Sequence, residues 1–229
     1  MRFEELKIEV EAGTIDTVLV AITDMQGRQQ GKRFHAPFYL NEVASKGTEA
    51  CGYLLATDVD MNTVGGYTAS SWSTGYGDIV LTPDPATMRR VPWQPGTVMI
   101  LANVTWPDGT EVTVSPRQIL QRQLELLRED GYVAYAGTEL EFVVFNDTYE
   151  DAWRNGYRDM TPANLYNVDY SLLGTGRVEP LLRRIRNEMA GAELVPESAK
   201  GECNLGQHEI AFRYAEAMKT ADGHCVYKT

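Results

Sequence analysis

The alternation of apolar and polar positions along the chain predicts several short strands and two amphipathic helices. Residues 17–22 and 98–104 are β-prone runs, and glycine or proline interrupts the stretches between them, so the first hundred residues are predicted to be rich in strands. Residues 65–78 show no hydrophobic period and carry no charge before Asp78. This pattern predicts a long loop, of the kind that often has a functional role.

Two helices are predicted together with their start and stop signals. The first begins after Ser115, an N-cap residue, with Pro116 in the first turn, and ends before Gly131. The second covers residues 179–190 and ends at Gly191. Apolar residues at helical spacing give each helix one face that is predicted to be buried. These residues are Ile119, Leu120, Leu124 and Leu127 in the first helix, and Leu181, Leu182, Ile185 and Met189 in the second.

Two further strand-like segments, residues 132–145 and 207–214, lie on either side of the second helix. Strands and helices therefore mix without a regular βαβ repeat, which predicts an α+β fold rather than a doubly wound sheet. A turn signal near residue 107 separates a predicted first domain, residues 1–107, from a second, residues 108–229.

Composition and charge narrow the classes of partner. A chain with 43% hydrophobic and 23% charged residues is expected to fold around a core. A net charge of −11 with thinly spread Lys and Arg disfavours nucleic acid as a partner. The first ten residues contain no long apolar run, so we expect no membrane partner and a cytoplasmic location. The odd number and wide spacing of Cys51, Cys203 and Cys225 favour reduced, structural thiols.

Acidic residues alternate along the segment 137–145. In a strand, the period of two places Glu139 and Glu141 on one face and the apolar residues between them on the other. Two carboxylates about 7 Å apart repel by roughly 2–3 kcal/mol at an effective dielectric of 20. For an isolated pair of this kind, a solvated strand face is the commoner explanation.

A second acidic segment lowers the weight of that explanation. Glu202 and Glu209 lie at a glycine-rich turn that leads into the last predicted strand. If the two strands are neighbours, all four glutamates converge on a set of oxygen ligands suited to Mg²⁺ or Mn²⁺, which are typical of phosphoryl transfer. No Walker or dinucleotide-binding glycine motif occurs, and His35, His208 and His224 are expected to be surface or packing residues.

Three separated motifs, in this order, resemble the glutamine synthetase family. The turn from Asp24 to Arg33 resembles the D-x-x-G-x-x-x-G-K-R turn of the family's N-terminal domain, and residues 70–78 resemble its substrate-side loop. Residues 137–145 resemble its E-x-E strand, and the stretch from Glu202 to Glu209 resembles its metal segment ending in G-Q-x-E. The resemblance covers the whole chain but only the first half of a family member. It implies an N-terminal β-grasp domain followed by the first part of the catalytic α+β domain.

The resemblance also implies a ligase that uses ATP and Mg²⁺ or Mn²⁺ to join an amine to the γ-carboxylate of glutamate through a γ-glutamyl phosphate. Of the four glutamates, Glu141, Glu202 and Glu209 match the ligands of a first metal and Glu139 matches a ligand of a second. The remaining positions that it assigns are Glu197 and Tyr214 near the nucleotide, and Thr68, Ser71 and Tyr170 on the substrate side.

Two departures from the family pattern concern the amine. Ammonia-using members carry Asp-Gly-Ser-Ser where this chain has Thr68-Ala69-Ser70-Ser71, so a carboxylate expected to bind ammonium is missing. The His-His that often precedes the metal segment is Lys200-Gly201 here. Both features resemble the branch of γ-glutamyl-amine synthetases that act on polyamines or ethanolamine.

Two other interpretations stay open: an ammonia-using glutamine synthetase, and a non-catalytic truncated chain that binds metal or associates with full-length relatives. The resemblance implies a homo-oligomeric ring in which the β-grasp domain of one subunit closes the site of the next. Several functional parts of the family fall beyond residue 229. The 229-residue chain alone is therefore expected to lack ligase activity.

Overall fold

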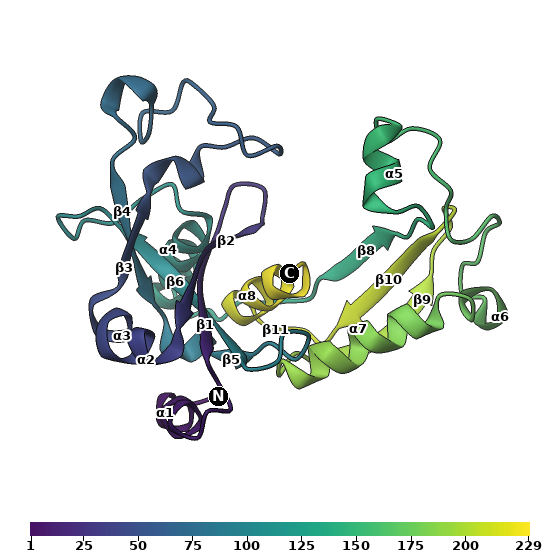
Figure 1. Cartoon of the computed structure of the whole chain (residues 1–229), viewed down its shortest axis with the longest axis horizontal. Helices are drawn as coiled ribbons and strands as arrows, with labels where there is room; N and C mark the ends of the chain where they lie inside the picture. The colour runs from purple at the N-terminus through teal and green to yellow at the C-terminus, as the bar shows by residue number, and fades with distance from the viewer. The chain divides into compact units, whose positions relative to one another are not determined.

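The computed structural model describes residues 1–229 apart from the side chain of Thr74, and its contacts group into two compact units (Figure 1). The first unit comprises Met1–Ala136 together with Glu216–Thr229, and the second comprises Gly137–Ala215. The division predicted between residues 107 and 108 falls inside the first unit and stays a prediction about domains.

A six-stranded sheet forms the centre of the first unit. Its strand order is β2-β1-β6-β4-β3, and the short β5 pairs with β6 as well. The pair β1 and β6 is parallel and the other pairs are antiparallel. The predicted runs at 17–22 and 98–104 are confirmed as β1 and β6. The strands are β1 (Thr17–Thr23), β2 (Gln29–His35), β3 (Thr48–Cys51), β4 (Asp78–Pro83), β5 (Arg89–Arg90) and β6 (Thr97–Thr105).

The two central strands of this sheet carry near-continuous apolar runs, as expected for strands covered on both faces. Every residue from Val18 to Ile22 is buried in β1, and β6 is buried along most of its length. The helix α1 (Phe3–Glu11) covers part of this core with Leu6, which is fully buried. A helical stretch made of α2 (Ala36–Phe38), a π turn (Tyr39–Val43) and α3 (Ala44–Lys46) adds Tyr39 to it. Three short 3-10 turns complete the connections: Gly52–Leu55, Trp72–Thr74 and Pro85–Thr87.

The helices α4 (Pro116–Glu129) and α8 (Ala217–Tyr227) also belong to the first unit. The predicted helix after Ser115 is confirmed as α4, but its predicted apolar face is only partly buried: Leu124 is buried, whereas Ile119 and Leu127 are exposed. Polar residues take their place in the interior. Gln118 is buried, and its Oε1 accepts a hydrogen bond from the N–H of Val104 at 2.7 Å. Arg117 is buried against two carboxylates.

The second unit is built on a three-stranded antiparallel sheet of order β8-β10-β9. The chain enters this unit after the short strand β7 (Tyr135–Ala136) and leaves it at the short strand β11 (Ala215–Glu216), which pairs with β7. The predicted single strand over 132–145 is therefore two strands, β7 and β8. The other elements of the unit are β8 (Glu139–Val143), α5 (Tyr149–Arg154), α6 (Leu172–Thr175), α7 (Glu179–Gly191), β9 (Pro196–Gly201) and β10 (Gln207–Phe212).

The long helix α7 lies along this sheet (Figure 1) and contacts β9. Leu182 and Met189 are buried as predicted, but Leu181 is exposed. Across the described part of the chain, no helix is long and apolar enough to cross a membrane.

Candidate functional site

The register of β8 and β10 brings three glutamates onto one face of the second sheet. Glu141 lies directly opposite Glu209, and Glu139 lies opposite Ala211. Because side chains alternate between faces with a period of two, Glu139 and Glu141 share the face of Glu209. This is the arrangement that the sequence pattern predicts for neighbouring strands.

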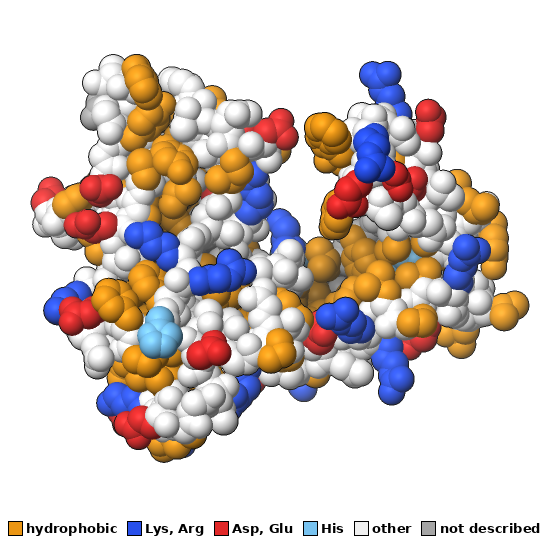
Figure 2. All heavy atoms as spheres, viewed as in Figure 1, with side chains coloured by type: hydrophobic (Ala, Val, Ile, Leu, Met, Phe, Trp, Pro, Cys, Tyr) orange, Lys and Arg blue, Asp and Glu red, His pale blue; other side chains and the backbone are white. Residues whose placement is uncertain are grey.

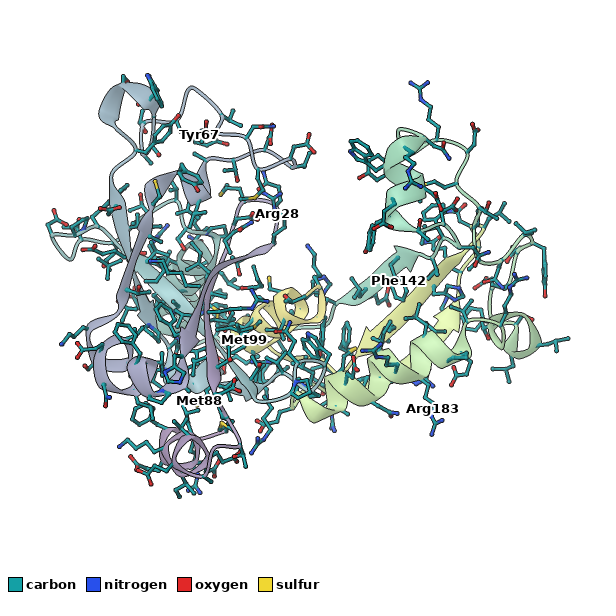
Figure 3. The ribbon with its side chains drawn as sticks, viewed as in Figure 1. Arg28, Tyr67, Met88, Met99, Phe142 and Arg183 are labelled. Carbon is teal, nitrogen blue, oxygen red and sulfur yellow. The ribbon has the colours of Figure 1, made fainter. Side chains whose placement is uncertain are left out.

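The other face of the same sheet is apolar and anchors it to the unit's core. Phe142 and Val144 pack with Val178 and Leu182, and Figure 3 shows Phe142 on β8. Hydrophobic side chains gather over the strand region of this unit in Figure 2. His208 lies fully buried on this side, with Nε2 3.1 Å from Oδ1 of Asn164, and burial lowers its pKa. Of the two roles predicted for His208, surface or packing, its burial shows the second.

Two glycines shape the hairpin that carries Glu202 between β9 and β10. Gly206 has a φ of +71°, and a Cβ there would lie 2.6 Å from the carbonyl oxygen of Val144. At Gly201 a Cβ would lie 2.4 Å from the carbonyl oxygen of Val168. Both positions therefore require glycine. The turn closes with the Glu202 N–H donating to the Gln207 carbonyl at 2.9 Å, which fixes Glu202 at the end of the acidic face.

The carboxylates of Glu202 and Glu209 share one positively charged neighbour, because Nζ of Lys200 donates to Glu202 and lies 3.5 Å from Oε2 of Glu209. Burial raises the pKa of Glu209, and the neighbouring Glu202 and the charge of Glu139 raise it further. The pKa of Glu202 is lowered, chiefly by a hydrogen bond from Lys200 and also by its contact with Glu209. Glu209 is 8% exposed, so its carboxylate has little water to stabilise its charge.

Additional polar groups border the acidic face. Gln207 donates a hydrogen bond to Oε2 of Glu141. Asp169 accepts a hydrogen bond from the Cys203 thiol, and carboxylate and thiol atoms of Asp169, Glu202 and Cys203 lie within 4.8 Å of one another. Asp169 was not predicted from the sequence because it lies in a loop outside both acidic segments. Only its position next to Tyr170 could have drawn attention to it.

The predicted nucleotide-side residues, Glu197 and Tyr214, lie on the same unit as the acidic face. Glu197 is exposed at the irregular end of β9, where its pairing with β10 shifts register. Tyr214 is exposed just after β10. Tyr170, predicted on the substrate side, adopts a positive φ of 52° and lies beneath the Lys200 ammonium, whose Nζ is 4.4 Å from the ring centroid.

Thr68 and Ser71 belong to the first unit, in the long loop before β4. Thr68 is exposed, and the Ser71 hydroxyl lies 2.9 Å from that of Ser73. The start of this loop is fixed by Arg28, labelled in Figure 3, which donates to the carbonyls of Asp58 at 2.9 Å and Val59 at 2.7 Å. Sequence reasoning did not identify this role of Arg28.

The acidic face suits a hard divalent cation by the chemistry of its donors, although among the described residues the carboxylate and thiol atoms already within 4.8 Å of one another are those of Asp169, Glu202 and Cys203. Glu139, Glu141, Glu202 and Glu209 supply carboxylate oxygens only, as Mg²⁺ and Mn²⁺ prefer.

Comparisons with known proteins agree with this geometry. The sequence profile of the glutamine synthetase catalytic domain matches residues 113–229. The chain is 67% identical over 226 residues to the gamma-glutamylethanolamide synthetase GlnA4 of Streptomyces coelicolor, covering 99% of this chain and 49% of that protein. It is 32% identical over 213 residues to a glutamate–isopropylamine ligase of a Pseudomonas species, covering 93% and 46%. The chain thus spans about half the length of these curated relatives.

Solved structures share the fold. A GmaS/ADP complex superposes with a TM-score of 0.75 at 23% identity, covering 97% of this chain and 47% of that one. A glutamine synthase homologue gives a TM-score of 0.76 at 20% identity, over 93% and 47%. Because the catalytic-domain profile matches half of the residues, this chain belongs to the glutamine synthetase family.

Proposed function

We propose that this sequence forms the metal-binding part of an ATP-dependent ligase that joins an amine to the γ-carboxylate of glutamate. The observation that carries the proposal is the shared face of Glu139, Glu141 and Glu209 on paired strands, with Glu202 linked to Glu209 by their common neighbour Lys200. The names of the relatives support the reaction class, since one is a gamma-glutamylethanolamide synthetase and another a glutamate–isopropylamine ligase.

In this proposal Glu141, Glu202 and Glu209 hold a first divalent cation and Glu139 contributes to a second. Such cations, when bound, neutralise phosphate oxygens and stabilise the charge that develops during phosphoryl transfer. The chain's own residues keep the ligands in position. The Gln207 amide orients Glu141, and the Gly201 and Gly206 backbone fixes Glu202 at the end of the sheet.

Glu197 and Tyr214 are proposed to border the nucleotide, and Tyr170, Thr68 and Ser71 the glutamate and amine. A β-grasp domain in the first unit and a ring of subunits follow from the same family resemblance and stay proposals.

Ethanolamine is the acceptor that we propose first, from the 67% identical relative. Thr68 offers no carboxylate to an ammonium ion, which favours a larger amine over ammonia. Asp60 and Asp78 are the two acids that could replace the missing carboxylate. Asp78 lines an open pocket of about 430 Å³ together with Lys32, so a positive charge of this chain already borders the same pocket as the Asp78 carboxylate.

The test joins this sequence to the remaining half of the Streptomyces coelicolor relative. We expect phosphate release that requires both glutamate and ethanolamine, and its loss in Glu209→Gln. Glu125→Gln, which changes an exposed acid on α4, is the matched control. Phosphate release that Glu209→Gln leaves intact would contradict the proposed role of the acidic face.

A further inference from the structure

Lys200 places an ammonium group over the acidic face, and the proposed function gives it no role. It is the register partner of Glu209 across β9 and β10, so the two side chains share a face. Its Nζ donates a hydrogen bond to the Glu202 carboxylate and lies 3.5 Å from Oε2 of Glu209. One lysine therefore contacts two of the three acids proposed for the first metal.

A second set of groups borders the same ammonium. Nζ of Lys200 lies 3.4 Å from Oδ1 of Asp169 and 4.4 Å from the ring centroid of Tyr170. The backbone holds these groups beside β9, because the Tyr170 N–H donates to the Gly201 carbonyl at 3.4 Å. A carboxylate and an aromatic face can stabilise an ammonium without any proposed metal ligand.

We propose that Lys200 competes with a divalent cation for Glu202 and Glu209 and thereby sets the metal affinity of this face. The inference rests on the proposed metal site. A divalent cation between the two carboxylates needs the oxygen atoms that Lys200 contacts, and it repels the ammonium. When the cation binds, the ammonium keeps Asp169 and the Tyr170 ring and gives up both glutamates. Metal binding therefore requires the loss of two ion contacts, which weakens it.

The test is the affinity of the 229-residue chain for Mn²⁺, measured from the electron paramagnetic resonance signal of the free ion. We expect Lys200→Gln to bind Mn²⁺ about tenfold or more tightly than the wild type, because a nearby positive charge is removed. Lys46→Gln is the matched control, because Lys46 is an exposed lysine of the first unit, paired with Glu42 at 2.6 Å. The Lys46→Gln chain should bind Mn²⁺ with the affinity of the wild type. Equal or weaker binding by Lys200→Gln would overturn the competition.

Glu209→Gln distinguishes failure of this inference from failure of the metal site itself. If Glu209→Gln does not weaken Mn²⁺ binding, the proposed metal site is wrong and the competition falls with it. A second measurement observes Lys200 directly by nuclear magnetic resonance, using protein in which the lysine side chains carry ¹³C-labelled dimethyl groups. The Lys200 resonance, assigned by its absence in Lys200→Gln, should shift when Mg²⁺ binds. A Lys200 resonance that bound Mg²⁺ leaves unchanged would overturn the displacement.

Discussion

Arg117→Met is predicted to destabilise the first unit strongly. Arg117 is 7% exposed, and its guanidinium donates to both carboxylate oxygens of Asp222 on α8, each at 2.9 Å. It also donates to Asp84 at 2.7 Å and to the Asn103 side chain. These bonds connect α4 with α8 inside one unit, although α4 precedes the acidic strands in the sequence and α8 follows them. The substitution keeps most of the side-chain volume and removes every one of these donors.

The size of the stability loss depends on the Asp222 carboxylate, which remains after Arg117 is replaced. Asp222 is itself 7% exposed, so loss of its partner leaves a buried carboxylate uncompensated. Removing one partner of a buried ion pair commonly costs ~3–5 kcal/mol, which lowers the ratio of folded to unfolded protein by about two to four orders of magnitude. Arg122→Met is the control. Arg122 pairs with Glu111 at the surface, where such a pair contributes less than ~1 kcal/mol.

Urea unfolding followed by tryptophan fluorescence measures this loss. In a Trp153→Phe background the remaining tryptophans, Trp72, Trp93 and Trp106, all belong to the first unit and report on it alone. Asp222→Asn in the Arg117→Met background should recover part of the stability, because it removes the uncompensated charge. A decrease in the free energy of unfolding below about 1 kcal/mol for Arg117→Met, equal to that for Arg122→Met, would show that the buried pair of Arg117 and Asp222 does not stabilise the first unit as described.

Three further outcomes are expected. The pKa of Asp24 is lowered, because hydrogen bonds from Arg28 and its neighbours outweigh the opposing effect of burial. The ionised Asp24 carboxylate therefore stabilises the fold above the ordinary aspartate pKa of ~3.9, and this stabilisation is lost as the pH falls below that value. Asp24→Asn should remove that part of the pH dependence of unfolding, and an unchanged acid limb would contradict it. Gly201→Ala should weaken Mn²⁺ binding at least several-fold, because its Cβ collides with Val168 and displaces the hairpin; wild-type affinity would show that the hairpin tolerates the change. In the chimera, Thr68→Asp should raise kcat/KM for ammonium relative to ethanolamine, and an unchanged ratio would remove Thr68 from the amine site.

The acidic face was predictable from the sequence because a strict period of two specifies a strand face whatever surrounds it. Once β8 and β10 pair, Glu139, Glu141 and Glu209 share a side. The central strands β1 and β6 were equally predictable from their continuous β-branched and apolar runs.

Other features depend on long-range contacts that no local pattern reports. The helix α1 was missed because the charges around Leu6 obscured its single fully buried position. The burial of Arg117 depends on Asp222, 105 residues away in the chain. The contacts of Lys200 depend on the loop that carries Asp169, which the sequence alone does not bring to the sheet.

The proposed function depends on Glu141, Glu202 and Glu209 binding a divalent cation together. Anomalous diffraction from crystals of the chain soaked in Mn²⁺ tests it most directly, because the signal locates the ion independently of any activity. We expect one dominant peak within coordinating distance of carboxylate oxygens from all three glutamates, and its loss in Glu209→Gln. A dominant Mn²⁺ peak elsewhere on the chain, or no peak at this face at saturating Mn²⁺, would contradict it.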